Sequence, residues 1–292
     1  MSRRIRTAAP ARGDRRQQPQ RRATPIAPLI CFLASGTSGL VYQVVWMREL
    51  TLVFGATTLA VSTVLAVFMG GLAFGSLTGG RWADRAKRPL RLYAWLELAI
   101  GLYGLAIPFL FSLLPTIYQP LWRTAGLSFF TLSLVRFVLA GLVLAIPTVL
   151  MGATLPVLSR VVARRAEAVG RDVGMLYTVN TVGAVIGASL AGLFLIPSIG
   201  MAGTTAVAAI LNLVAGAVAY AMDRRQTLEP EVASDGAVEA PRSQVLTRPA
   251  SIALFAAFGV SGIAALVYEV AWTRALSLVL GSSVYAFTIM LT

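Results

Sequence analysis

Long apolar segments, separated by short polar and basic stretches, fill almost the whole chain after residue 25. Each complete segment holds about 20 residues or more, which at about 1.5 Å of helix rise per residue crosses a bilayer core of about 30 Å. The expected spans cover about residues 28–47, 58–79, 90–114, 130–158, 173–197, 202–222 and 252–272, and an eighth begins near residue 283. The pattern predicts an all-α, polytopic membrane bundle.

One stretch occurs twice. Residues 35–55 read SGTSGLVYQVVWMRELTLVFG, and residues 261–281 read SGIAALVYEVAWTRALSLVLG, so the copies align without a gap. Each copy opens a long apolar region, and a repeat of several spans is typical of secondary transporters. The repeat therefore predicts six complete spans and the start of a second set. By this alignment Thr292 corresponds to Ala66, in the middle of a span, so we expect the chain to be a fragment.

The repeat and the polar stretches predict four parts. We expect a disordered basic cytoplasmic tail, a first six-span repeat, a flexible cytoplasmic linker and the truncated start of a second repeat. These parts cover residues 1–25, 26–222, 223–250 and 251–292.

The distribution of basic residues predicts the orientation in the membrane. The chain is 57% hydrophobic and 13% charged, with a net charge of +13. Arginine and lysine concentrate in the tail, in the second-to-third and fourth-to-fifth loops and after the sixth span. The other side has Arg48, Arg123 and Arg136 alone. Basic loops stay in the cytoplasm, so we expect a multi-pass protein of the inner (plasma) membrane with a cytoplasmic N-terminus. The expected partner of this charge is the lipid bilayer rather than nucleic acid.

The chain has no histidine and one cysteine, Cys31, inside the first apolar segment. This composition excludes disulfides within the chain, His/Cys metal sites, Ser-His-Asp triads and Cys-His nucleophiles. We therefore expect neither a metal nor another cofactor in these residues.

Several polar and aromatic side chains fall inside the expected spans. An inner layer is expected from Tyr42, Gln43, Trp46, Glu97, Tyr177 and Asn180. Such residues either hydrogen-bond neighbouring helices or line a path for a proton or a small polar or cationic ligand. Helix-breaking residues favour the second alternative, because transporter sites are built on broken helices. They are Gly36 and Gly39 in the first span and Pro147 and Pro156 in the fourth.

The repeat counterparts of this layer are Tyr268, Glu269, Trp272 and Arg274. The second copy keeps the aromatic residues and the arginine but carries Glu269 where the first has Gln43. Nearer the outer side, an outer polar cluster is expected from Arg48, Glu49 and Arg136, with Glu49 pairing with one of the two arginines.

The loop after the second span reads GRWADRAKR from Gly80 to Arg88. It resembles the G-x-x-x-D-R-x-x-R loop of major facilitator transporters, in which the aspartate caps a helix terminus and pairs with basic residues to latch one conformation. Asp84 and Arg85 match that latch. The alternative is an ordinary basic loop that contains one acid.

Small residues recur at intervals of four on the second and fifth spans. They are Gly71, Gly75, Gly79, Gly183, Gly187 and Ala191. This spacing places them on one face of each helix and predicts close helix packing.

Four phrases together carry a resemblance over nearly all of residues 28–292. They are LVYQVVWMREL with its copy LVYEVAWTRAL, STVLAVFMGGLAFGS, PTVLMGATLPVLSR and LYTVNTVGAVIGASLAGLFLIPSIG. They resemble the membrane part of bacterial fused major facilitator/spermidine synthase-like proteins. The resemblance implies a cytoplasmic C-terminal domain similar to polyamine aminopropyltransferases, which transfer an aminopropyl group from decarboxylated S-adenosylmethionine to putrescine.

No Gly-rich turn between a strand and a helix is expected in this chain, so any catalytic residues are expected beyond Thr292. The resemblance then implies a membrane module that anchors its own C-terminal domain and serves it by moving a polyamine or related cation. Two alternatives stay open, a plain secondary transporter without an enzyme domain and a purely structural scaffold.

Overall fold

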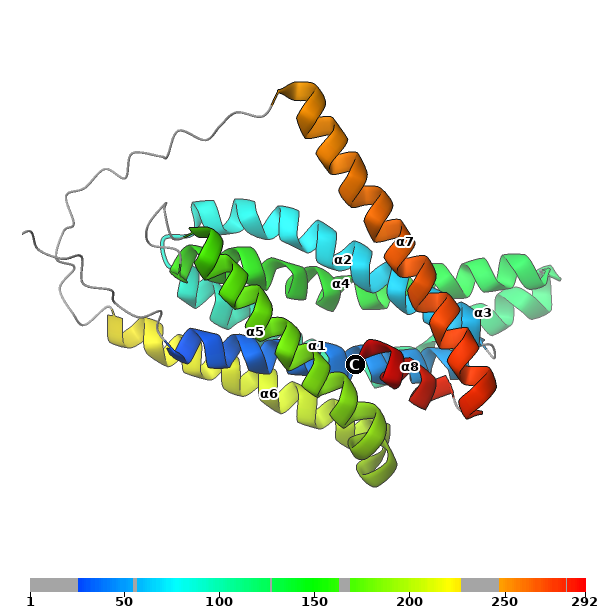
Figure 1. The fold of residues 1–292 in the computed structure, drawn as a ribbon. Coiled ribbons are helices and arrows are strands. Elements are labelled where there is room, and N and C mark those ends of the chain that lie inside the picture. The colour runs from blue at the N-terminus through cyan, green and yellow to red at the C-terminus, as the bar shows by residue number, and fades with distance from the viewer. Residues whose placement is uncertain (1–25, 55–56, 127, 163–168, 227–246, 282) are drawn as a thin grey trace, which may run out of the picture.

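The computed structural model describes residues 26–54, 57–126, 128–162, 169–226, 247–281 and 283–292. Throughout these ranges the regular structure is helical (Figure 1). The elements are α1 (Ile26–Phe54), α2 (Thr57–Arg85), α3 (Pro89–Ala125), α4 (Phe129–Val162), α5 (Val169–Leu190), the π-helical η2 (Ala191–Leu195), α6 (Ile196–Gln226), α7 (Arg248–Leu280) and α8 (Ser283–Leu291). The expected tail (residues 1–25) and most of the expected linker (residues 227–246) lie outside the described residues.

Six helical stretches are long and apolar enough to cross a membrane, with α5 and α6 counted as one stretch. The prediction of an all-α bundle of long apolar helices is therefore confirmed. Helix α6 has a sharp break near its start, at Gly200, whose φ of 71° and ψ of −179° are not helical. A side chain is strongly disfavoured at this φ, so glycine permits the reversal of chain direction that Figure 1 shows between α5 and the long part of α6.

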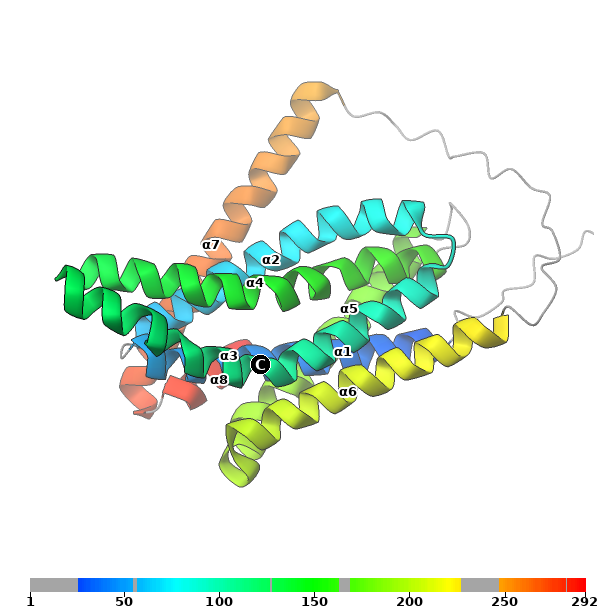
Figure 2. The same cartoon turned by 180° about the vertical axis from the view of Figure 1, so that it is seen from behind.

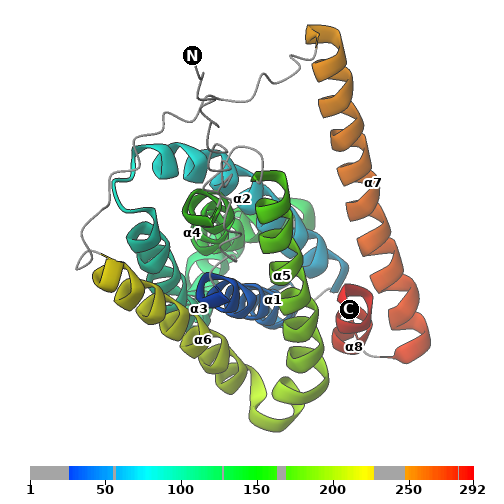
Figure 3. The same cartoon turned by 60° about the vertical axis from the view of Figure 1, so that its left-hand side comes forward.

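Helix α1 lies at the centre of the bundle. It contacts α2, α3, α4, α5 and α6, and Figure 3 shows it enclosed by these neighbours. Two thirds of its apolar window is buried, whereas none of the corresponding window of α7 is. Figure 2 shows α7 leaning away from the other helices, and its main contacts are with α8 and α2.

The glycines on α2 let that helix approach α4 closely. A β-carbon at Gly71, Gly75 or Gly79 would overlap Thr148, Val149 or Ala153 of α4. On α5, Gly183 and Gly187 lie against the backbone of α1 at Leu33 and Thr37. The prediction that these small residues serve helix packing is confirmed.

The expectation of broken helices is wrong for the first and fourth spans. Helix α1 runs unbroken through Gly36 and Gly39, and α4 runs unbroken through Pro147 and Pro156. Gly36 instead provides space for the backbone carbonyl of Asn180 on α5. Proline is tolerated in apolar bundles where neighbouring helices and side chains satisfy the freed backbone groups.

We predict that Gly75→Ala destabilises the bundle while Gly70→Ala does not. A β-carbon at Gly75 would overlap the Val149 carbonyl oxygen, so α2 and α4 must separate, which typically costs about 1–3 kcal/mol. Gly70, on the same helix, has open space around it. Thermal unfolding of the detergent-purified variants measures the difference, and equal melting temperatures would contradict the close α2–α4 contact.

Candidate functional site

The inner layer is built first on α1. Tyr42 and Trp46 are stacked, with ring centroids 5.1 Å apart and an interplanar angle of 16°, and both are buried. One turn of helix separates the two residues, which places their rings on the same face. The Tyr42 ring lies against Gly104 of α3, where a β-carbon would overlap it. This glycine therefore sets how deeply α1 packs against α3.

Glu97 of α3 is fully buried and meets α6. Its Oε2 accepts a hydrogen bond of 2.6 Å from Nδ2 of Asn212. Ser35 of α1 and Tyr93 of α3 also lie beside this carboxyl group. Three polar atoms of this group have no hydrogen-bond partner within the described residues, namely Glu97 Oε1, Asn212 Oδ1 and Tyr93 OH. A buried acid is costly in an apolar bundle, and such acids mark proton and ion paths.

Asn212 was missed by the sequence analysis. Its signal is a single amide in the middle of the apolar run AVAAILNLVAG. The prediction placed Tyr177 and Asn180 beside Glu97 instead. Tyr177 is 63% exposed and faces outward, and Asn180 packs at Gly36. Asn212 therefore takes the place beside Glu97 that the sequence analysis gave to Asn180.

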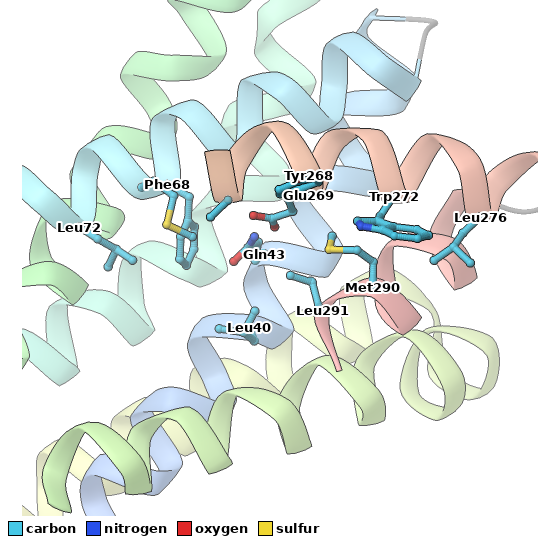
Figure 4. Close-up of a pocket in the computed structure, with 12 residues that line it drawn as sticks. Leu40, Gln43, Phe68, Leu72, Tyr268, Glu269, Trp272, Leu276, Met290 and Leu291 are labelled. Carbon is cyan, nitrogen blue, oxygen red and sulfur yellow. The ribbon is translucent and has the colours of Figure 1, made fainter. Parts of the chain in front are cut away.

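The two copies of the repeat meet at a pocket of about 620 Å³ between α1, α2, α7 and α8 (Figure 4). Gln43 lines it from α1, and Tyr268, Glu269 and Trp272 line it from α7. Figure 4 shows the Gln43 amide and the Glu269 carboxylate pointing toward one another. Arg274 lies elsewhere, in a small space against α2 beside Thr58 and Val61. The pocket therefore combines the acid and aromatic residues of the second copy with the amide of the first.

No group of three or more His, Cys, Asp or Glu side chains in the described ranges could hold a metal ion. The Gln43–Glu269 pocket offers one carboxylate and one amide, too few oxygen ligands for a divalent cation.

The outer polar cluster does not form as expected. Among the described residues, Glu49 makes no ion pair with Arg136 or Arg48. Arg136 Nη1 instead donates to the Phe54 carbonyl at 3.4 Å, and the guanidinium carbon lies 4.5 Å from the centroid of the Tyr118 ring. The last carbonyls of a helix lack intrahelical donors, and an aromatic face attracts a guanidinium. The C-terminus of α1 therefore competes with Glu49 for this arginine.

The expected latch loop contains an ion pair. Asp84 accepts a 2.9 Å hydrogen bond from Arg160 Nη1, so the end of α2 is joined to the last turn of α4. Arg85 takes part in none of the ion pairs of the described ranges. Both members of the Asp84–Arg160 pair are exposed, and exposed pairs contribute at most about 1 kcal/mol.

A more buried pair lies at the same end of the bundle. Asp223 of α6 lies 2.8 Å from Arg91 Nε and 3.6 Å from Arg88 Nη1, and Arg91 and Arg224 lie over the Tyr220 ring. This contact joins the start of α3 to the end of α6. It was also missed by the sequence analysis.

Comparison with known proteins identifies a distant relative. The chain is 25% identical over 202 residues to polyamine aminopropyltransferase 1 of Streptomyces coelicolor. The matched part is 68% of this chain and 34% of that protein, so the chain spans about a third of the length of the curated relative that it matches. No protein-family model matches the chain, and no solved structure matches it. The similarity supports the resemblance at the level of a distant relation to a polyamine aminopropyltransferase.

We predict that Asn212→Leu destabilises the bundle more than Glu97→Gln does. Asn212→Leu removes the donor to a buried carboxyl group and leaves it unsatisfied, at a cost of about 1–3 kcal/mol. Glu97→Gln keeps the size of the side chain and an acceptor oxygen for Asn212. Equilibrium unfolding of both single variants and the double variant measures the coupling. Additive single effects would show that the two side chains do not interact.

Proposed function

We propose that this chain is the membrane module of a polyamine aminopropyltransferase-type fusion protein and that it moves a polyamine or a related organic cation. The observation that carries the proposal is the 202-residue similarity to polyamine aminopropyltransferase 1, which falls on a chain of long apolar helices. Under this proposal, residues 26–222 form a first membrane repeat and residues 251–292 begin a second, with a major-facilitator-like arrangement. The module anchors an aminopropyltransferase-like domain of the same protein.

The buried acids support an organic cation as the transported species. Glu97 is enclosed between α3 and α6, and Glu269 lines the pocket between the repeat copies. Neither carboxylate forms an ion pair with a described arginine or lysine. A carboxylate that lacks a cationic partner in the protein attracts a cationic ligand, and polyamines are cationic at neutral pH.

The proposed orientation puts the N-terminus in the cytoplasm of a bacterium. The start of α1, the connection between α2 and α3, and the end of α6 lie at one end of the bundle, the left in Figure 1. Arg85, Arg91, Arg160 and Arg224 lie on elements that end or begin there. Basic residues on one side of a membrane protein favour the cytoplasmic side.

A second candidate is a plain secondary transporter without an enzyme domain. The internal repeat and the Asp84–Arg160 pair favour it, because both are features expected of major-facilitator-like transporters. The two candidates share the transport step and differ in aminopropyl transfer.

Proteoliposomes that contain the full native protein test both activities. We expect spermidine to accumulate above the level of protein-free liposomes, and Glu97→Gln to reduce this flux because it removes a buried acid from the proposed path. Glu49→Gln makes the same chemical change near the end of α1 and should leave the flux unchanged.

The second measurement in the same system is conversion of putrescine and decarboxylated S-adenosylmethionine to spermidine. Conversion by the native protein supports the fusion, and flux without conversion favours the plain transporter. Absence of flux for spermidine and putrescine would contradict transport.

A further inference from the structure

We infer that the pocket between the two repeat copies binds one alkylammonium ion, with the ammonium group at Glu269 and Gln43 and the alkyl chain along the apolar wall. The inference deepens the proposed function and rests on it for the role of the cation, whereas binding itself can be tested without transport.

The polar end of the pocket has unused hydrogen-bonding capacity. Gln43 is almost completely buried, and neither its Oε1 nor its Nε2 has a hydrogen-bond partner within the described residues. Oε1 of Glu269 is likewise buried and without a partner in those ranges. The two groups point toward one another across the pocket (Figure 4). Buried polar groups without partners carry a desolvation cost, which a ligand that bonds to both can remove.

The charge of the pocket selects a cation. Glu269 is the one ionisable acid among the residues that line it, and the described lining contains no arginine or lysine. Tyr268 and Trp272 stand on the same helix at the pocket wall, and aromatic faces attract ammonium groups. The pocket therefore provides a carboxylate, an amide oxygen and aromatic rings, all of which favour an ammonium group.

The rest of the wall selects an alkyl chain. The remaining lining side chains are apolar, among them Leu40, Phe68, Leu72, Leu276, Met290 and Leu291. These side chains give a continuous apolar contact for methylene groups, which are driven out of water. A hydrated inorganic cation gains nothing from such a wall, and the two oxygen-bearing side chains cannot replace its hydration shell.

The difference between the two repeat copies sets the number of carboxylates in the pocket. Gln43 and Glu269 occupy equivalent positions of the two copies, so the pocket brings one sequence position together with its own counterpart. Because only the second copy carries the acid, the pocket holds one negative charge and suits one ammonium group. A second acid at Gln43 would convert it into a site with two carboxylates.

Binding of n-hexylammonium to the full native protein in nanodiscs tests the inference, with n-hexanol as the neutral ligand of similar length. We expect hexylammonium to bind more tightly than hexanol in calorimetry. Glu269→Gln should weaken hexylammonium binding about tenfold or more, because it removes the charge that faces the ammonium group. Glu49→Gln should leave the affinity unchanged.

Gln43→Glu provides a gain-of-function test that a loss of folding cannot imitate. The added carboxylate should shift the preference of the pocket from hexylammonium toward the dication of 1,6-diaminohexane. Unchanged hexylammonium affinity in a folded Glu269→Gln variant, or equal affinity for hexanol, would overturn the site.

The outcome is independent of the transport assay. Hexylammonium binding that depends on Glu269, without spermidine flux, supports the site and contradicts the proposed function alone. If spermidine flux is present but hexylammonium binding is unchanged in Glu269→Gln, the proposed function is supported and its cation binds elsewhere in the protein.

Discussion

Close approach of helix backbones at glycines is the contact on which the rest of this structure depends. Gly75 brings α2 against α4, Gly187 brings α5 against α1, and Gly216 brings α6 against the Ala94 carbonyl of α3. Between apolar helices in lipid there is no hydrophobic driving force, so close packing and interhelical hydrogen bonds hold them together. Three such helix pairs leave α1 enclosed at the centre of the bundle.

Enclosure of α1 determines which polar groups are isolated from solvent and lipid. Tyr42, Gln43 and Trp46 all point into the bundle because their helix has hardly any free face. Tyr42 then packs against Gly104 of α3, the helix that carries Glu97, while Gln43 reaches the pocket beneath α7. The same packing that stabilises the bundle therefore creates two polar sites. The Glu97–Asn212 pair is fully enclosed, and the Gln43–Glu269 pocket is open beside the second repeat copy.

The sequence predicted the helices and their small-residue faces, because apolar length and spacing by four are local properties. It did not predict which residues the polar side chains contact. Arg136 lies at the Phe54 carbonyl rather than at Glu49, and Asn212 rather than Asn180 bonds Glu97. These choices depend on the rotation of each helix about its axis. A difference in rotation moves a side chain from a neighbouring helix to the surface of the bundle, where Tyr177 lies.

Cross-linking across the pocket tests most directly whether the two repeat copies face each other there. In a Cys31→Ser background, Gln43→Cys and Glu269→Cys should be joined by a short bifunctional thiol reagent in native membranes. The pair Ile30→Cys and Glu269→Cys should not be, because Ile30 lies 13 residues, or about 20 Å, farther along α1. If each cysteine reacts singly but the Gln43→Cys and Glu269→Cys pair is never joined, the copies do not meet and the account of the pocket is wrong.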